Sequence, residues 1–261
     1  MIEPLDVIIL FVFGTIIGSF LNALAFRYNT GRSMWGRSAC LSCGTTLKAI
    51  HLVPLLSYLG LKGKCASCKA GISPQYPIVE MVAGVLTAFS FMETQGDTAS
   101  FIVVLSFFTI LLFISVYDLR HTIIPDAFVY AAALIALGAS FFGYTTIDIS
   151  DSVLGALVLS VPIALLWVIS RGRLIGLGDA KLFFACGAFL GLVSGAAAFM
   201  LSFWIGALFG LGLLLVSSFS KRSHGVTMES EVPFGPFIVL ATAVAYFGHI
   251  GLYDILAFLA L

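Results

Sequence analysis

Charged residues are scarce in this chain. Only 10% of its 261 residues are Asp, Glu, Lys or Arg, whereas 60% are hydrophobic. Soluble domains carry about 25% charged residues, so this composition excludes a soluble globular protein. The sequence also lacks the alternating segments of roughly 10 residues, joined by short turns, that build an outer-membrane barrel. Its apolar runs are long enough for spanning helices, so we expect an all-α polytopic membrane protein.

The first apolar run, residues 7–26, lacks the features of a cleaved signal peptide. No Lys or Arg precedes it, and Gly18-Ser19-Phe20-Leu21-Asn22 is not a small-x-small cleavage pattern. We therefore expect a retained first transmembrane helix. Ser19 and Asn22 favour close helix packing through an interhelical hydrogen bond, with contact to a substrate or methyl donor as the alternative.

Hydropathy predicts about eight transmembrane helices. They lie near residues 5–26, 78–92, 101–117, 127–143, 153–170, 180–193, 196–219 and 236–258. All 13 basic residues then fall on one side: Arg27, Arg32, Arg37, Lys48, Lys62, Lys64, Lys69, Arg120, Arg171, Arg173, Lys181, Lys221 and Arg222. The other side carries acidic residues and no basic one: Glu3, Asp6, Glu93, Asp97, Asp148 and Asp151. By the positive-inside rule the basic side is cytoplasmic, which leaves both termini outside.

Two cysteine pairs interrupt the apolar pattern. Cys40-x-x-Cys43 and Cys65-x-x-Cys68 are separated by 21 residues within the polar segment 27–77. Two such pairs can present four thiolates tetrahedrally to Zn²⁺, and four thiolates leave no open position for water. We therefore expect a structural zinc ion in a small cytoplasmic domain. A redox dithiol or a disulfide pair, which the reducing cytoplasm disfavours, and cysteines without metal are the alternatives.

Two aspartates lie at helix ends on the expected cytoplasmic side. A charge in an apolar membrane helix is energetically costly, so such residues usually have a function. Asp118 follows the segment 101–117, at a helix C-terminus that disfavours an anion, and Asp179 opens the segment 180–193, at an N-terminus that favours one. General acid/base attack of water on an amide requires one protonated and one ionised carboxyl group, so we expect a catalytic pair. The alternatives are a salt bridge with Arg120 for Asp118 and a plain N-cap for Asp179.

The helix that begins at Asp179 is short. Its run to about Val193 has some 15 residues and a length of about 22 Å, against a hydrocarbon core of roughly 30 Å. Asp179 would then lie below the inner surface of the membrane. Irregular backbone such as Arg171–Gly178 is tolerated at that depth only where it lines a cavity, so we expect a water-filled notch open to the cytoplasm.

Two further carboxylates have structural interpretations. Glu80 lies near the start of the helix at 78–92, where it can cap the helix or bind a cationic group such as an amine or a sulfonium. Asp126 follows a proline and precedes an apolar run, which is typical of an N-cap.

Two functions of other classes compete with an enzyme. A transporter or channel would use intramembrane aspartates to bind cations, but it would need polar residues near the midplane of several helices, and these helices have almost none. A zinc-containing assembly protein of a secretion system would leave Asp118 and Asp179 without a role.

The order of motifs resembles the bacterial type IV prepilin leader peptidases, which are GxGD aspartyl peptidases and N-methyltransferases. The resemblance covers nearly the whole chain. It rests on Gly18-Ser19-Phe20-Leu21-Asn22 with Arg27, the two cysteine pairs, Ser57-Tyr58-Leu59 with Gly63-Lys64-Cys65, Tyr76-Pro77 with Glu80, Asp118 with Pro125-Asp126, Gly176-Leu177-Gly178-Asp179 with Lys181, and Pro233-Phe234-Gly235-Pro236-Phe237.

The resemblance implies that Asp118 and Asp179 catalyse removal of the leader of type IV prepilins and type II secretion pseudopilins, after a Gly, on the cytoplasmic side. It also implies methylation of the new N-terminal residue with S-adenosylmethionine, for which Glu80 is our candidate contact. The implied location is the bacterial cytoplasmic (inner) membrane, with prepilins or pseudopilins and the lipid bilayer as partners and no nucleic acid.

The expected division of the chain has three parts. Residues 1–26 form the first transmembrane helix, 27–77 a cytoplasmic tetracysteine zinc-binding domain, and 78–261 a seven-helix membrane aspartyl peptidase core. The sequence gives no oligomeric state.

Overall fold

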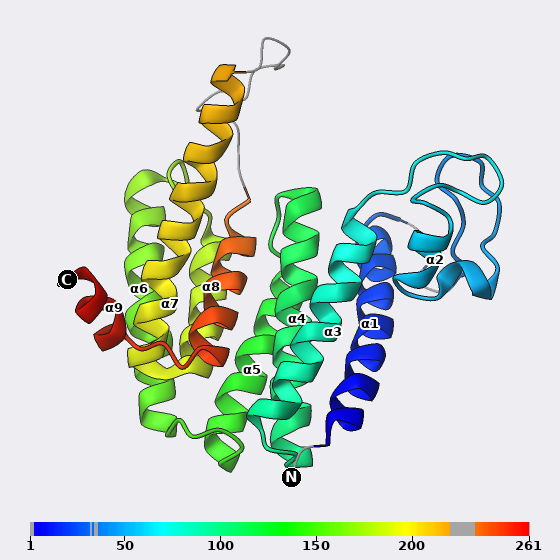
Figure 1. Cartoon of the computed structure of the whole chain (residues 1–261). Coiled ribbons are helices and arrows are strands. Elements are labelled where there is room, and N and C mark those ends of the chain that lie inside the picture. The colour runs from blue at the N-terminus through cyan, green and yellow to red at the C-terminus, as the bar shows by residue number, and fades with distance from the viewer. Residues whose placement is uncertain (1–2, 32, 34–35, 220–232, 261) are drawn as a thin grey trace. The chain divides into compact units, whose positions relative to one another are not determined.

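The computed structural model describes residues 3–31, 33, 36–219 and 233–260. In these ranges the regular structure is helical, with two isolated β-bridges. The helices in Figure 1 are α1 (Pro4–Arg27), the 3₁₀ helix η1 (Ala49–Leu52), α2 (Leu56–Gly60), α3 (Gln75–Glu93), α4 (Thr98–His121), α5 (Asp126–Phe142), α6 (Ile149–Ser170), α7 (Leu177–Phe219), α8 (Gly235–Phe247) and α9 (Leu252–Leu259). Arg32, Lys221 and Arg222, which we expect on the cytoplasmic side, lie outside the described residues.

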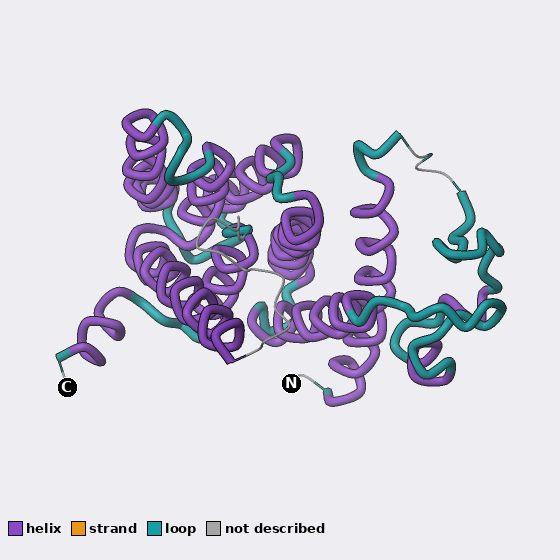
Figure 2. The backbone as a smooth tube through the Cα atoms, turned by 90° about the horizontal axis from the view of Figure 1, so that it is seen from above, coloured by secondary structure: helices purple, strands orange, loops and turns teal. Residues whose placement is uncertain are grey.

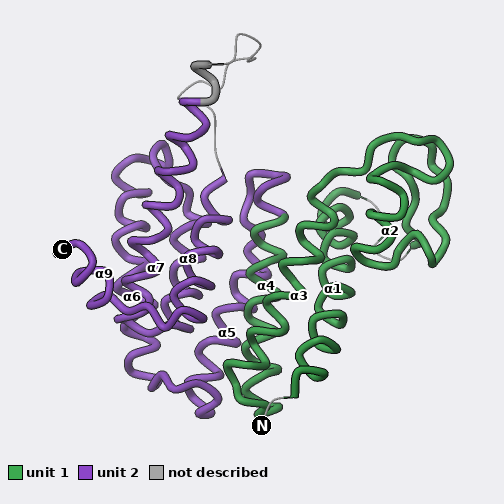
Figure 3. The backbone as a smooth tube through the Cα atoms, in the orientation of Figure 1, with its two compact units in different colours: residues 1–116 green, residues 117–261 purple. Residues whose placement is uncertain are grey.

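The chain divides into two compact units. The first comprises residues 1–116 and the second residues 117–261, as Figure 3 shows. The long helix α4 runs through the division, so its last turn, which carries Asp118, belongs to the second unit.

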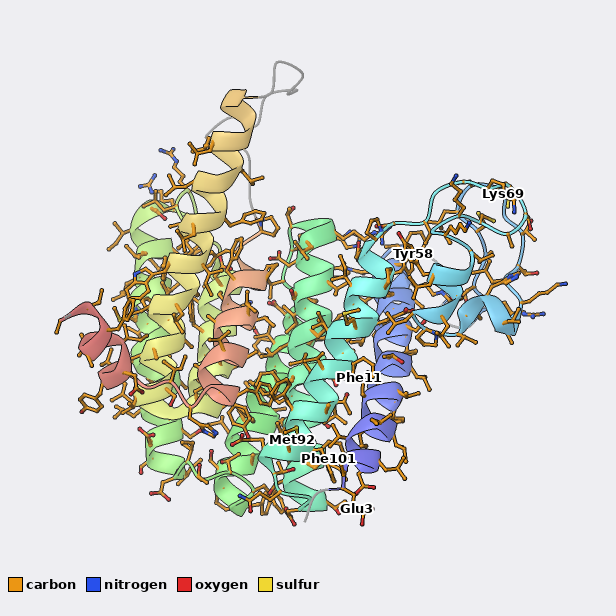
Figure 4. All side chains as sticks on the ribbon, viewed as in Figure 1. Glu3, Phe11, Tyr58, Lys69, Met92 and Phe101 are labelled. Carbon is orange, nitrogen blue, oxygen red and sulfur yellow. The ribbon has the colours of Figure 1, made fainter. Side chains whose placement is uncertain are left out.

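In the first unit α1 packs along α3 (Figure 1). A Cβ atom on Gly18 would lie 2.7 Å from the Cα atom of Glu80, so only a glycine permits this approach. Phe11 lies between the two helices (Figure 4), and its ring would be 2.8 Å from a Cβ atom on Gly84. Small residues at such contacts are typical of helix pairs in membranes. The side chain of Asn22 donates a hydrogen bond of 3.2 Å to the carbonyl oxygen of Tyr76, which confirms the expected interhelical bond.

The loop-rich segment between α1 and α3 carries the four clustered cysteines. Figure 2 shows it beside α1, with two short helical elements among loops. Lys69 and Glu3 lie at opposite ends of the unit in Figure 4, as the predicted separation of basic and acidic residues requires.

In the second unit α7 folds back on itself at Gly191. This glycine has φ 71° and ψ −173°, which is not helical, and the rings of Phe183 and Phe199, on either side of it, are only 4.9 Å apart. The first arm packs closely on α6, since a Cβ atom on Gly155 would lie 2.6 Å from the carbonyl oxygen of Gly187. The two arms correspond to the segments predicted at 180–193 and 196–219.

The predicted membrane fold is confirmed, while the number of spans depends on how three elements are counted. In the described residues five helices are long and apolar enough to cross a membrane, or six if the bent pair α8 and α9 forms one span. Helix α5, with 17 residues, falls below that length. The predicted total of about eight is reached only by adding α5 and by counting the two arms of α7 separately.

Asp151 on α6 stabilises the reversal in α7. Its Oδ1 atom accepts a hydrogen bond of 3.2 Å from the backbone N–H of Leu192, and Oδ2 contacts Gly191. The neighbouring Ser152 donates a bond of 2.6 Å to the carbonyl oxygen of Ala188. The sequence placed Asp151 among the outward acids and gave no sign of this cap.

We expect Asp151→Ala to lower the free energy of unfolding by about 1.5–3 kcal/mol. The substitution removes the carboxylate that accepts the N–H of Leu192, and a hydrogen bond to a charged group is worth about that much. The measurement is denaturant unfolding in mixed micelles. Asp148→Ala is the matched control, because Asp148 is exposed and makes no side-chain cap. Equal destabilisation by both variants would contradict this role of Asp151.

Candidate active site

Asp118 and Asp179 are both buried in the second unit. Asp118 lies in the last turn of α4 and Asp179 in the first turn of α7, and only 4% and 9% of their surfaces are exposed. The two carboxylates are close enough to interact electrostatically. Two acids separated by 60 residues of chain are therefore brought into one buried environment, as the sequence predicted.

Asp118 is held by the start of α8. The backbone N–H of Gly235 donates a hydrogen bond of 3.0 Å to Oδ2 of Asp118. A Cβ atom on Gly235 would lie 2.7 Å from the same oxygen, so the approach requires glycine. Because Gly235 begins α8, the positive end of that helix faces the carboxylate. Sequence reasoning missed this contact, although Gly235 belongs to the motif Pro233-Phe234-Gly235-Pro236-Phe237 on which the resemblance rests.

Asp179 is held by its own loop. Its Oδ2 atom accepts a hydrogen bond of 3.2 Å from the backbone N–H of Gly176, just before α7 begins. This is the backward bond that an acid at the third helical position makes to the N-cap backbone, so Asp179 is not itself the N-cap that was considered as its alternative. The carboxylate is thereby fixed in orientation.

Asp126 has a different role from the predicted N-cap. Helix α5 begins at Asp126 itself, with Pro125 at the cap position and no side-chain cap. Its two carboxylate oxygens instead each accept a hydrogen bond of 2.8 Å from Nζ of Lys181. The prediction was wrong because the partner, Lys181, lies on another helix and is distant in sequence.

This ion pair joins the segment after Asp118 to the helix that carries Asp179. Beside it, a Cβ atom on Gly178 would lie 3.0 Å from Cβ of Ile124. The starts of α5 and α7 are thus in contact through one polar and one apolar pair. Such contacts restrict the movement of one aspartate relative to the other.

The four predicted metal ligands come together in the first unit. The Sγ atoms of Cys40, Cys43, Cys65 and Cys68 all lie within 4.8 Å of one another, and none of these residues is in a disulfide. The two pairs have the same local fold, since each first cysteine donates its N–H to a carbonyl five residues on. The cluster could hold a metal ion.

Local hydrogen bonds favour the thiolate form of two of these cysteines. The hydroxyl and N–H groups of Thr45 lower the pKa of Cys43 to about 6. The backbone N–H groups of Cys68 and Ser67 lower the pKa of Cys65. Cys68 differs, because the N–H of Ala70 lowers its pKa but the neighbouring Cys43 and Cys65 side chains and burial together raise it to about 11. Thiolates are the form that ligates metals, and two of the four cysteines already favour it.

Glu80 is buried between α3 and the loop-rich segment. Only 7% of its surface is exposed, and Oε2 accepts a hydrogen bond of 2.7 Å from the backbone N–H of Leu55. Leu55 has φ 59° and ψ −52°, an uncommon conformation for a residue with a side chain. Helix α3 begins at Gln75, five residues earlier, so the capping alternative for Glu80 is wrong. Its carboxylate instead fixes a turn that is distant in sequence.

Comparison with known proteins identifies the family. The family model described as Bacterial Peptidase A24 N-terminal domain matches residues 12–94, and the Type IV leader peptidase family model matches residues 105–211. A protein of Bacillus subtilis (strain 168) named prepilin leader peptidase/N-methyltransferase is 34% identical over 246 residues, which is 91% of this chain and 92% of the relative.

Other relatives carry the same name. One from Pseudomonas putida is 30% identical, over 90% of this chain and 88% of its own length. One from Aeromonas salmonicida (strain A449) is 29% identical, over 91% of this chain and 89% of its own length. No solved structure matches. The chain therefore belongs to the type IV leader peptidase family and is a membrane-embedded peptidase.

Proposed function

We propose that this chain is an aspartic endopeptidase that removes the leader of type IV prepilins or pseudopilins, after a Gly, on the cytoplasmic side of the inner membrane. The observation that carries the proposal is the buried pair Asp118 and Asp179, each bonded to a backbone N–H and in electrostatic contact with the other. The names of the relatives support the substrate. The distribution of Lys and Arg supports the cytoplasmic orientation of the site.

In the proposed mechanism the two carboxyl groups share one proton. The ionised member takes a proton from a water molecule, whose oxygen attacks the carbonyl carbon of the scissile amide. The protonated member donates its hydrogen to the carbonyl oxygen, which stabilises the tetrahedral intermediate. As that intermediate collapses, one of its hydroxyl groups returns a proton to the ionised carboxylate, the C–N bond breaks, and the other carboxyl group gives its proton to the leaving amine. The dyad thereby regains its single shared proton.

The helix polarity assigned the ionised form to Asp179. The structure removes the basis for that assignment. The N–H of Gly235, at the start of α8, favours an anion at Asp118 as well. Each acid thus has one backbone N–H donor, so either member can carry the negative charge in the proposed mechanism.

The test of this function uses the purified chain in proteoliposomes and a prepilin that retains its leader. Mass spectrometry of the products is expected to show loss of the leader and, with S-adenosylmethionine present, addition of one methyl group to the new N-terminus. An intact prepilin after prolonged incubation would refute the proposed peptidase function.

We further propose that the cysteine cluster binds a structural Zn²⁺. The Sγ atoms of Cys40 and Cys68 are 3.8 Å apart. A tetrahedron with zinc–sulfur bonds of about 2.3 Å has edges of about 3.8 Å, so this pair is already at the spacing that the ion requires. Bound zinc would link the two cysteine loops, which contain few buried apolar residues, and would take no part in catalysis.

Cys65→Ser is expected to reduce the zinc content from about one ion per chain to a small fraction of that value, because a closed site requires all four thiolates. The measurement is elemental analysis of the purified protein. Cys186→Ala is the control, because this buried cysteine lies on α7 outside the cluster and the variant should keep its zinc. Retention of full zinc content by Cys65→Ser would contradict the proposed site.

The N-methyltransferase activity in the names of the relatives requires a methyl donor, which we propose to be S-adenosylmethionine. This group supplies a methyl on a sulfonium cation. The buried carboxylate of Glu80, which also interacts with the side chain of Ser19 on α1, is a polar site between α1 and α3 that suits a cation. In our proposal Glu80 orients either the donor or the amine of the new N-terminus.

Glu80→Gln is expected to lower the methylation rate about 10- to 100-fold, because the charge is lost while the amide oxygen still accepts the N–H of Leu55. Cleavage of the leader should continue at close to the normal rate. Both rates can be measured on one substrate by mass spectrometry, with Glu93→Gln at the other end of α3 as the control. Unchanged methylation would exclude Glu80 from this role.

A further inference from the structure

The loop-rich segment exposes an unusual amount of apolar surface. We use the name apolar strip for five side chains on and between η1 and α2: Ile50, Leu52, Val53, Leu56 and Leu59. Ile50, Leu56 and Leu59 expose 71%, 69% and 70% of their surfaces. None of them lies on a helix long enough to span a membrane. Exposed patches of this kind mark sites of interaction with a partner or a membrane.

The apolar strip is tied to a membrane helix. The N–H of Leu55, in the middle of the strip, is bonded to Glu80, which lies five residues into α3. Five residues correspond to about 7.5 Å along a helix. The strip is therefore held alongside the first turns of α3 rather than beyond its end. Figures 1 and 2 both show the segment lying beside α1.

The charge around the strip indicates what it contacts. Residues 27–77 contain seven basic residues and no acidic one. Lys48 and Lys62, which are both exposed, flank the strip in sequence. A surface with exposed aliphatic side chains bordered by lysines is complementary to anionic lipid headgroups above acyl chains.

We propose that residues 49–60 form an interfacial element that inserts the apolar strip into an anionic bilayer surface. Lys48 and Lys62 then contact the lipid phosphates. This contact, together with the bond from Leu55 to Glu80, fixes the cysteine-containing segment against the membrane beside α1 and α3. The inference is independent of the catalytic role of the aspartates.

The test places a single tryptophan at Leu59 of the full chain, with Trp35, Trp167 and Trp204 replaced by Phe. The protein is reconstituted in phosphatidylcholine vesicles with or without phosphatidylglycerol, and the acyl chains are brominated near the headgroup. We expect the emission of Leu59→Trp to be quenched at least about twofold with phosphatidylglycerol present. Leu41→Trp, at an exposed leucine outside the strip, is the matched control and should be quenched much less.

A second variant separates the charge from the apolar contact. Lys48→Gln with Lys62→Gln keeps the strip, so the dependence of quenching on phosphatidylglycerol should fall while the protein stays folded. Equal quenching at positions 41 and 59, or none at 59, would overturn the proposal. The proposal would also be overturned if the tryptophan at position 59 were protected from solvent only after a prepilin is added. That result would show that the apolar strip binds the substrate instead of the lipid.

Discussion

Asp118→Asn and Asp179→Asn are each expected to lower the rate of leader cleavage by about a thousandfold or more. Asn is nearly the same size as Asp and keeps an oxygen to accept the N–H of Gly235 or Gly176. The change therefore removes proton transfer while it leaves the contacts around the site. A general acid or base typically increases the reaction rate by about 10²–10⁴-fold, so the loss of either group should reduce the cleavage rate by a factor in that range.

The measurement is the initial rate of prepilin cleavage under saturating substrate. Asp148→Asn serves as the control, because Asp148 is an exposed acid at the start of α6 and should leave the rate unchanged. Unfolding in mixed micelles should show that both dyad variants remain folded. A variant that keeps more than about a tenth of the normal rate would remove that aspartate from the mechanism.

Gly235→Ala is expected to lower kcat by about 100-fold with little change in KM. The added Cβ atom would lie 2.7 Å from Oδ2 of Asp118, so the carboxylate or the start of α8 must move. Displacement of a catalytic group by about 1 Å can cost this much, because the reacting atoms are no longer aligned. Binding of substrate elsewhere on the protein should be affected less.

Gly210→Ala is the matched control for this substitution. Gly210 also lies in a helix, but a Cβ atom there would meet no atom within 4 Å. Alanine is a better helix former than glycine, so the control should be active and at least as stable as the natural chain. If Gly235→Ala retains its kcat, the contact between α8 and Asp118 is not required for catalysis.

The sequence predicted features that depend on composition and local spacing. Long apolar runs located most of the helices to within a few residues, and the two C-x-x-C turns located the cysteine cluster. The run predicted as one helix at 236–258 is instead divided into α8 and α9, which meet at a bend of 96°. The positions of Asp118 and Asp179 at helix ends, together with the count of spans between them, were sufficient to predict that they lie on the same side of the membrane.

The features that were missed depend on contacts between distant segments. Asp126 has the local pattern of a cap, and only the packing of α5 against α7 reveals its bond to Lys181. The carboxylate of Asp151 stabilises the turn at Gly191, and the N–H of Gly235 reaches Asp118 across 117 residues of chain. Such long-range partners leave no periodic signal in a single sequence, because any helix in the bundle could have supplied them.

The central claim is that Asp118 and Asp179 act as one catalytic unit. Its most direct test is the single-turnover cleavage rate of the double variant Asp118→Asn with Asp179→Asn, compared with each single variant. Groups that act together show strongly non-additive losses, so we predict that the double variant is no slower than the slower single variant. A double variant whose loss equals the product of two independent single losses would contradict a shared-proton dyad.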